Sequence, residues 1–207
     1  MAHKSLGGAQ PEIAAPIGLN ALSGLEPDAQ ECSLNIMDRD TGDAGGISAL
    51  GYRALMRHQA GAVAVVATGA GTARAGLTAT AFSSLSDTPP TLLVCVQRKA
   101  GAHDLIASLG VFSVNILAAD QQDVAELFSG KSGIKGDERF HGQTWISLTT
   151  GAPVLSNALA VLDCELVESH QFSSHTIFIG RVVDGVTRMS ADPLLYFRGD
   201  YWNLADR

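Results

Sequence analysis

The sequence predicts a mainly β, antiparallel fold, built as a closed or partly closed barrel with a few short flanking helices. Six apolar runs are rich in Val, Leu, Ile and Phe, turn residues separate them, and only three segments have helical spacing. A barrel is favoured because closure protects sheet edges that would otherwise be exposed.

The expected elements follow one another along the chain. Residues 47–61 predict a first helix, with Ser48 placed to cap it and Gly61 placed to stop it. Short helices are expected at 103–110 and 120–130. The strand-like runs cover residues 62–68, 75–85, 91–97, 111–117, 158–172 and 174–185.

Glycines between the first two strand-like runs resemble part of a dinucleotide-binding loop. Gly69 and Gly71 are present, but Arg74 stands where a third glycine is needed, and the following residues have no helical pattern. We therefore interpret the glycines as the turn of a β-hairpin, where they permit positive φ.

Composition indicates one globular domain. The 207 residues are 46% hydrophobic and 17% charged, and no apolar run approaches the ~20 residues that a membrane helix needs. The first residues show no secretory signal, and three widely spaced cysteines without a CxxC pair are typical of a reducing cytoplasm. Cys95 and Cys164 fall in strand-like runs and are interpreted as small buried hydrophobes.

The charge distribution divides the chain in two. A net charge of -7 argues against a nucleic-acid partner, and residues 1–46 carry -5 of it without any aromatic residue. We interpret 1–46 as a flexible arm and 47–207 as the folded domain. The alternative is that the arm orders over a partner subunit through residues 17–25.

Several segments allow a functional and a structural interpretation. The "FSGKS" of residues 128–132 lacks the glycine and preceding strand of a phosphate loop, so Lys131, Lys135 and Arg139 are interpreted as a solvated loop, with nucleotide contact the lesser alternative. No metal-binding histidine pair is present. His170 and His175 flank a predicted turn, where either a structural role or a side chain reaching a cleft is open.

The stretch "SLSDTPPTLLVCV" of residues 84–96 is distinctive because two prolines hold it extended. Its hydroxyls and Asp87 suit either a rigid loop before a strand or a donor surface for a polar heterocycle or phosphate.

Four motifs in register resemble one known family. "GLTATAFSSLSDTPPTLLVCV", "FSVNIL", "HTIFIG" and "PLLYFRGDYWNL" are similar to those of the flavin reductases that supply reduced flavin to two-component monooxygenases. The resemblance extends from Tyr52 to Leu204 and implies a split β-barrel that binds FMN or FAD and forms a homodimer with its flavin sites near the subunit interface.

The resemblance also implies site residues. One set would cradle the flavin ring and ribityl chain: Thr78, Ala79, Thr80, Ala81, Phe82, Ser84 and Leu85. A second would contact the flavin phosphate: Lys99, Ala100, Gly101, Ala102, His103 and Asp104. The nicotinamide nucleotide would meet His175, expected as the catalytic contact, and Asp200, Tyr201, Trp202 and Asn203.

The implied reaction is hydride transfer from NADH or NADPH to the flavin, with the protein holding the two rings face to face. Two departures from the family pattern are visible: Ser173 and Ser174 precede His175, and Asp200 replaces a basic residue, which favours NADH. The expected acceptor of the reduced flavin is a partner oxygenase. The alternatives are a reductase that holds its flavin and reduces a corrin cobalt or ferric chelate, or a non-catalytic flavin- or haem-binding barrel.

Overall fold

A computed structural model describes residues 39–40 and 46–204 of the chain. The predicted N-terminal arm lies outside the described residues, except for β1 (Arg39–Asp40) and Gly46, which opens β2 (Gly46–Ile47). These two short strands pair antiparallel with each other.

The first helix, α1 (Ala49–Met56), begins as the sequence predicts. The Ser48 hydroxyl accepts a hydrogen bond from the Gly51 N–H at 3.1 Å, as an N-cap does. The predicted stop at Gly61 is wrong, because the helix ends at Met56 with Arg57 as its C-cap. Gly61 instead opens the extended strand β3 (Gly61–Ala62), which pairs with a C-terminal strand.

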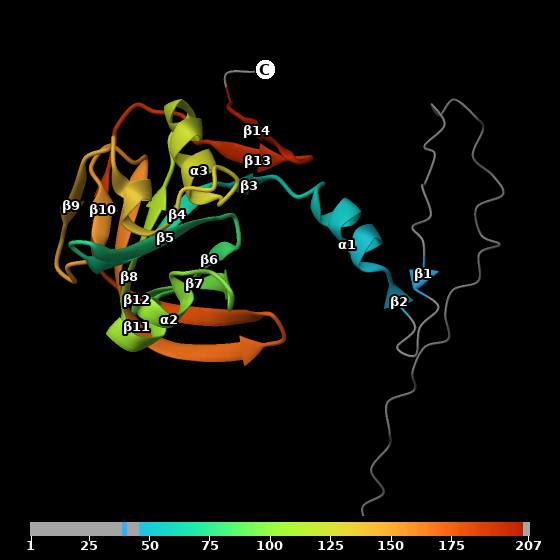
Figure 1. Cartoon of the computed structure of the whole chain (residues 1–207), viewed down its shortest axis with the longest axis horizontal. Helices are drawn as coiled ribbons and strands as arrows, with labels where there is room; N and C mark the ends of the chain where they lie inside the picture. Colours follow the sequence, from blue (N-terminus) through green and yellow to red (C-terminus); the bar gives the residue numbers. More distant parts are fainter. Residues whose placement is uncertain (1–38, 41–45, 205–207) are drawn as a thin grey trace, which may run out of the picture. The chain divides into compact units, whose positions relative to one another are not determined.

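One seven-stranded antiparallel sheet forms most of the domain (Figure 1). Its strands in spatial order are β5 (Ala73–Ala79), β4 (Ala64–Ala70), β8 (Val111–Ile116), β11 (Ala160–Phe172), β12 (His175–Thr187), β7 (Pro90–Gln97) and β6 (Phe82–Asp87). The two ends of this order, β5 and β6, are consecutive in the chain and are joined only by Thr80 and Ala81. The sheet therefore curves round on itself and stays open between β5 and β6, which confirms the mainly β, split-barrel prediction.

The structure corrects one strand and confirms one turn. The run 75–85, expected as one strand, is two strands that belong to opposite ends of the sheet. The β4–β5 hairpin predicted around Gly69 and Gly71 is confirmed, with φ of +88° and +56°. A Cβ on Gly69 would lie 2.2 Å from the Ala73 carbonyl oxygen, so a side chain has no room in this turn.

Smaller elements cover the barrel. The predicted helices appear as α2 (His103–Leu109) and as η1 (Ala119–Gln121) followed by α3 (Gln122–Phe128). The sequence analysis did not predict η2 (Gly136–Phe140), β9 (Trp145–Ser147), β10 (Pro153–Leu155), β13 (Leu195–Phe197) and β14 (Asp200–Trp202). Strand β9 pairs with β10, and β13 lies between β14 and β3. No helix in the described part of the chain is long and apolar enough to cross a membrane.

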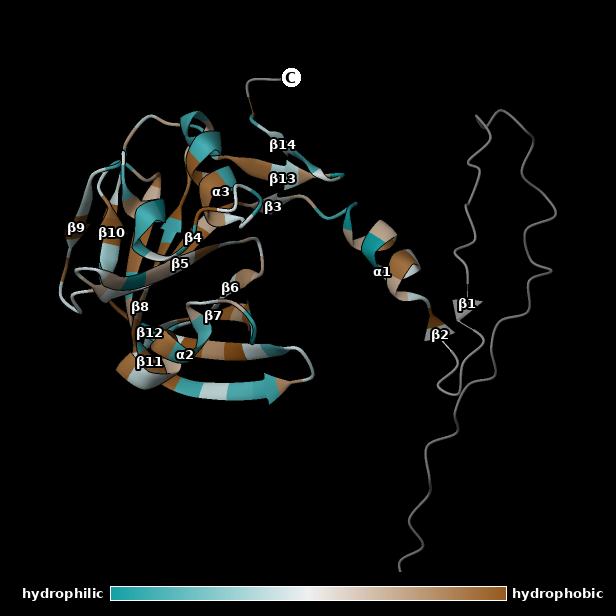
Figure 2. Ribbon diagram, viewed as in Figure 1, coloured by the Kyte–Doolittle hydropathy of each residue, from teal (hydrophilic) through white to brown (hydrophobic). Residues whose placement is uncertain are grey.

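Two hydrophobic clusters lie on the two faces of β4, and Figure 2 shows the apolar character of this strand. Val63, Val65 and Ala67 belong to the cluster with Phe128 and Phe140. Ala64 and Val66, between them in sequence, join the cluster around Phe112 and Phe178. Successive strand residues point to opposite faces, so a strand buried on both sides reads as an unbroken apolar run.

A buried polar network connects β8 to its neighbours. Asn115 Nδ2 donates to the Val65 carbonyl at 3.0 Å and to the Ser113 hydroxyl at 2.9 Å, and Oδ1 accepts from the Leu155 N–H at 2.7 Å. The Ser113 hydroxyl donates to the Pro153 carbonyl. The "FSVNIL" motif thus fixes β4 and β10 against β8.

Candidate flavin site

A cavity of about 830 Å³ lies next to the junction that joins the two ends of the sheet. One wall is β5 with Phe128 and the segment from Ser129 to Arg139, and the facing wall is β7, the loop after it and the start of β12. Thr80 and Ala81 join the two walls. The cavity therefore lies beside the β5–β6 junction, with β7, the neighbour of β6 in the sheet, in its second wall.

Residues predicted from three separate motifs converge on this cavity. Its lining includes Thr78 to Ala81 from the first motif, Lys99 to Gly101 from the predicted phosphate segment, and His175. Many lining residues are small, so the backbone is accessible and a flat ring has room between the walls: Ala75, Gly76, Ala79, Ala81, Ala100 and Gly101.

The Thr78 hydroxyl is already used within the protein. It donates to the Ala125 carbonyl at 2.6 Å and so joins β5 to α3. Gly76, two residues earlier, lets the same helix approach, because a Cβ there would lie 2.8 Å from Phe128 Cε1. In this part of the wall, the groups that face the cavity are therefore mainly backbone and small side chains.

Six predicted residues of the flavin and phosphate segments do not line the cavity. Phe82 lines a neighbouring cavity of about 500 Å³ beside α1, and Ser84 and Leu85 are exposed on β6. Ala102 is buried in the core, and the Asp104 side chain is 96% exposed. The sixth, His103, is buried next to the cavity wall.

The contacts of His103 are internal. Its Nε2 lies 2.8 Å from the Thr176 hydroxyl, its Nδ1 lies 2.7 Å from the Asp104 carboxylate, and its ring centroid is 5.4 Å from that of Phe178. The ring connects α2 to β12, the strand that carries His175. His103 therefore stabilises the cavity wall that β12 and α2 form, through contacts within the protein.

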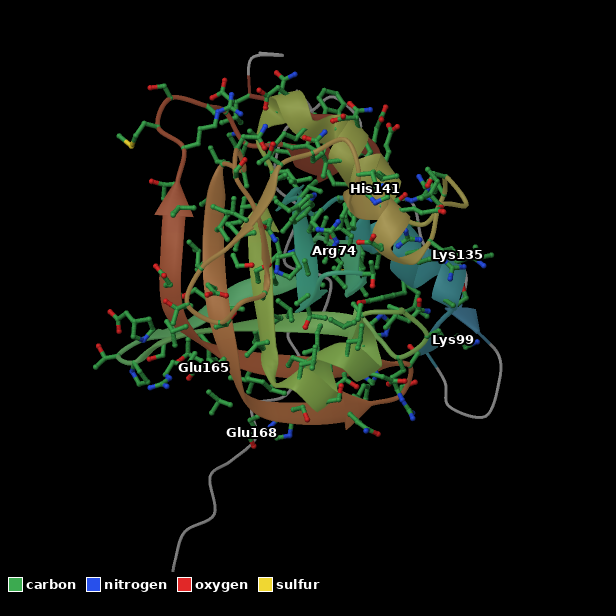
Figure 3. The ribbon with its side chains drawn as sticks, turned by 60° about the vertical axis from the view of Figure 1, so that its left-hand side comes forward. Arg74, Lys99, Lys135, His141, Glu165 and Glu168 are labelled. Carbon is green, nitrogen blue, oxygen red and sulfur yellow. The ribbon has the colours of Figure 1, made fainter. Side chains whose placement is uncertain are left out.

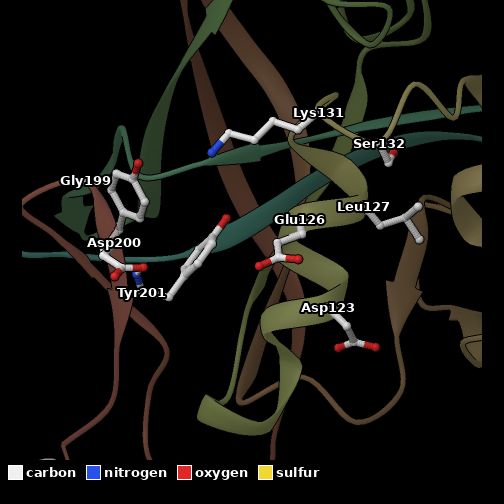
Figure 4. A pocket seen from close by; sticks show the side chains of 9 residues that line it. Asp123, Glu126, Leu127, Lys131, Ser132, Gly199, Asp200 and Tyr201 are labelled. Atoms are coloured by element: carbon white, nitrogen blue, oxygen red, sulfur yellow. Dashed lines mark hydrogen bonds between the residues drawn. The ribbon is translucent and has the colours of Figure 1, made fainter.

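The predicted nicotinamide segment lies elsewhere. Asp200 and Tyr201 line a separate cavity of about 500 Å³ together with Glu126 and Lys131 (Figure 4). Burial, with the nearby Glu126 carboxylate, raises the pKa of the Tyr201 hydroxyl. Trp202 and Asn203 line neither cavity, and the indole N–H of Trp202 donates to the Phe197 carbonyl at 3.2 Å.

The main cavity is strongly cationic although the chain is acidic. Arg74, Lys99, Lys135 and Arg139 line it, and no carboxylate does so among the residues that the structure describes. In Figure 3, Lys99 and Lys135 lie on the same side of the molecule, away from Glu165 and Glu168. Such a site attracts anions, because low-dielectric walls strengthen the field of the cations.

Two of these cations are held in place by the protein. Arg74 forms an ion pair with Asp137 and lies 4.5 Å above the Phe140 ring, and its guanidinium holds the pKa of the Asp137 carboxyl below the usual value. Arg139 donates to the Ile134 carbonyl at 2.7 Å and to the Gly76 carbonyl at 3.3 Å. The segment from Lys135 to Phe140 is thereby fixed against β5.

Sequence reasoning missed much of this cationic wall. Lys135 and Arg139, interpreted as a solvated loop, line the cavity, and Arg74 was considered only as a missing glycine. The signal in the sequence was the regular spacing of Gly130, Gly133 and Gly136, which permits a tightly turning loop. In the structure these glycines have φ values of +83°, +76° and +58°.

His175 is exposed at the first position of β12, opposite Gln97 of β7. Its Nδ1 lies 2.8 Å from the Ser174 hydroxyl, and Ser173 in the turn has φ of +52°. The side chain lines the cavity, which agrees with the cleft-facing alternative. His170 on the same hairpin does not line the cavity and lies 2.9 Å from the Glu168 carboxylate.

The two strand cysteines differ from each other. Cys164 is buried as expected, and burial raises the pKa of its thiol to about 12. Cys95 is half-buried and lines the main cavity, so its interpretation as a buried hydrophobe is wrong. No cluster of three or more His, Cys, Asp or Glu side chains suited to a metal occurs in the described ranges.

The turn at residues 87–90 is structural. The chain reverses there between β6 and β7, with Asp87 opposite Pro90. The Ser86 hydroxyl accepts from the Thr88 N–H at 3.1 Å, and neither residue lines the main cavity. Residues 86–90 thus form a tight turn outside the main cavity, as the rigid-loop interpretation expects.

Comparison with known proteins agrees with this geometry. The family model described as "Flavin reductase like domain" matches residues 56–205, well over half of the chain. The chain belongs to this family. The resemblance seen in the four sequence motifs is confirmed.

Individual relatives resemble the chain over most of the folded domain. The FMN reductase (NADH) RutF of Agrobacterium fabrum is 42% identical over 152 residues, which are 73% of this chain and 86% of that protein. The flavin reductase component of a bacterial two-component tryptophan halogenase, BorF, is 34% identical with a TM-score of 0.71, covering 77% of this chain and 100% of that chain. A Streptomyces globisporus NADH:FAD oxidoreductase, solved with NAD and FAD fragments, is 28% identical with a TM-score of 0.68, covering 74% of this chain and 90% of that chain.

Proposed function

We propose that this chain is an NADH-dependent flavin reductase whose flavin binds in the cavity of about 830 Å³. The observation that carries the proposal is the combination of cations, small residues and His175 in one cavity without a lining carboxylate among the described residues. A flavin nucleotide has the matching chemistry, since it joins a flat ring to an anionic phosphate. The bound flavin would supply the hydride-accepting centre.

Each part of the wall has a proposed role. Backbone groups from Thr78 to Ala81 would hold the flavin ring, and donors there would stabilise the negative charge of its reduced form. Lys99 with the backbone of Ala100 and Gly101 would bind the flavin phosphate. His175 would orient the nicotinamide over the ring.

NADH is the proposed hydride donor. Relatives such as the RutF protein of Agrobacterium fabrum are named FMN reductase (NADH), and Asp200 would repel the extra phosphate of NADPH if the nucleotide reaches the second cavity. The contact of Asp200 to Asn203 with the nucleotide stays a prediction.

Anaerobic mixing with NADH tests the function. We expect NADH to bleach a several-fold excess of free FMN, because the flavin is then a substrate that exchanges. Bleaching limited to one flavin per chain would indicate a tightly held cofactor that reduces another acceptor. Absence of bleaching, with flavin bound, would indicate a carrier or sensor and would overturn the proposal.

A partner oxygenase is the proposed consumer of the reduced flavin. The similarity to a halogenase reductase component supports this class of acceptor over a corrin or ferric chelate. The test mixes this chain with a purified oxygenase. Product formation should be lost when an excess of an electron acceptor oxidises the reduced flavin in transit, and catalase is present to remove hydrogen peroxide.

A homodimer is the proposed assembly, and α1 is its proposed interface. Leu50, Leu55 and Met56 are 73%, 49% and 44% exposed, and Gly51 is the buried residue of this helix. A helix of eight residues has little stability without packing, so a second copy of the chain is the partner that we expect to cover it. Light scattering should give twice the chain mass, and Leu50→Ser with Leu55→Ser should lower it, whereas Leu109→Ser on α2 should not.

A cytoplasmic location is also proposed. It rests on the absence of a disulfide between the free Cys95 and Cys164 within the described domain. Fractionation of cells that express the full chain would test it.

A further inference from the structure

The cations of the main cavity come from two separate parts of the fold. Lys99 follows β7 on one wall, whereas Arg74, Lys135 and Arg139 belong to β5 and the segment that includes η2 on the other. A flavin mononucleotide has one phosphate, which the first wall is proposed to bind. The second group of cations is then left without an assigned ligand.

The protein compensates these charges unequally. Arg74 is paired with Asp137, so its charge is largely neutralised. Arg139 binds two carbonyl oxygens, which orient the guanidinium without cancelling its charge. The Lys135 side chain is exposed and makes no hydrogen bond or ion pair with any other described residue.

Hydride transfer requires both nucleotides in the cavity at the same time, because the two rings must be in contact. NADH brings a pyrophosphate, and FAD carries one in place of the single phosphate of FMN. At least one further anionic group therefore has to be placed beside the flavin.

We propose that Lys135 and Arg139 form a second phosphate-binding site, which takes the pyrophosphate of a dinucleotide bound in the cavity. This inference rests on the proposed function. The dinucleotide is either NADH or FAD, because both carry the same diphosphate chemistry. The Arg74–Asp137 pair acts as a positioning element, since it fixes the start of η2 to β5.

Lys135→Gln is the test variant, because it removes the charge of an exposed side chain that makes no hydrogen bond or ion pair with the residues the structure describes. Arg98→Gln is the matched control: Arg98 is exposed, precedes Lys99 and lies outside the cavity lining. Titration calorimetry would compare FMN with FAD, and reduction kinetics would compare NADH with reduced nicotinamide mononucleotide, which lacks the pyrophosphate.

We expect Lys135→Gln to weaken binding of one dinucleotide by about five-fold or more, as for loss of a charge-assisted hydrogen bond. The mononucleotide counterpart and the Arg98→Gln protein should change by less than about two-fold. Loss confined to NADH identifies the hydride donor as the source of the pyrophosphate, and loss confined to FAD identifies the flavin.

Equal loss for FMN and FAD together with unchanged NADH kinetics would overturn the proposal, because Lys135 would then bind the first flavin phosphate. Equal behaviour of Lys135→Gln and Arg98→Gln toward every ligand would also overturn it. The FMN and FAD titrations need no turnover, and neither does a calorimetric titration with NAD, which carries the same pyrophosphate as NADH, so both sources can be tested even if the chain reduces no flavin. A failure of the site is thereby distinguishable from a failure of the proposed function.

Discussion

Two polar regions of this domain differ in how their side chains are hydrogen-bonded. Around Asn115, every amide atom of the side chain has a hydrogen-bonding partner within the protein. In the main cavity, the ammonium groups of Lys99 and Lys135 have no such partner among the described residues.

This difference in hydrogen bonding distinguishes polar groups that stabilise the fold from polar groups that are free to bind a ligand. A buried polar group without a partner destabilises the fold, so the groups around Asn115 are satisfied and serve to fix strands. The lysines remain hydrated at the mouth of a cavity and can exchange water for a ligand. Whether a polar side chain has hydrogen-bonding partners within the protein therefore indicates whether it stabilises the fold or is available to a ligand.

The largest expected effect is at Asn115, whose side chain is fully hydrogen-bonded within the protein. Asn115→Leu removes three hydrogen bonds and leaves the Val65 carbonyl and the Leu155 N–H without this partner. We expect the free energy of unfolding to fall by about 2–4 kcal/mol, measured by urea denaturation. The control is Asn157→Leu at an exposed position, which should change it by less than about 0.5 kcal/mol. A similar small change in both variants would contradict the structural role.

In the main cavity, His175→Ala should lower the rate of flavin reduction by NADH by about ten-fold or more, a loss of roughly 1.4 kcal/mol of transition-state stabilisation. The reason is loss of the contact that orients the nicotinamide, so the flavin affinity should change little. Stopped-flow reduction of bound flavin measures the step directly. His170→Ala, on the same hairpin but outside the cavity, is the control. An unchanged rate with a lower melting temperature would assign His175 a structural role.

A smaller effect is expected at Lys99. Lys99→Gln should weaken FMN binding by about five-fold and leave riboflavin binding unchanged, because only FMN carries the phosphate. Fluorescence titration with FMN and with riboflavin separates the contribution of the phosphate from that of the ring. The control is Arg98→Gln, which makes the same change of charge outside the cavity lining. Equal loss for riboflavin would mean that Lys99 contacts the ring or supports the wall.

The smallest effect is expected from removal of residues 1–46, which precede the matched family region at 56–205. The truncated chain should reduce flavin within about three-fold of the full chain, a difference below 1 kcal/mol. Steady-state turnover at saturating NADH measures it. A large loss would show instead that the arm orders over an active site.

Sequence reasoning predicted the strands well where one physical signal controlled the pattern. Strand β4 is buried on both faces and β12 alternates, so both produce clear apolar patterns. The junction at Thr80 and Ala81 was missed because it contains neither glycine nor proline, although the chain crosses there between the two ends of the sheet. The three-residue strands β9 and β10 are too short to give a periodic signal.

Several residues that line the main cavity belong to motifs visible in the sequence, whereas its positive charge was not predicted. Thr78 to Ala81, Lys99 to Gly101 and His175 could be placed because local motifs carry them. Lys135 and Arg139 reach the cavity only through tertiary contacts, above all the hydrogen bond from Arg139 to the Gly76 carbonyl, 63 positions away in sequence. His103 shows the reverse case, a residue inside a motif whose contacts support the wall.

The opening between β5 and β6 also determines how local unfolding and ligand occupancy are linked. Strand β5 has a single neighbour, β4, and β6 has a single neighbour, β7, so these terminal strands should exchange their amide hydrogens before the central ones. A molecule in the cavity would touch β5 on one side and β7 with the loop after it on the other, whereas no residue of β6 lines the cavity. Amide protection of Ala73–Ala79 should therefore rise on saturation, while that of Phe82–Asp87 rises less and that of β8 and β11 stays nearly constant. A bound ligand would thus link β5 to β7, two strands that are not neighbours in the sheet, and would couple the stability of the terminal strand β5 to occupancy of the cavity.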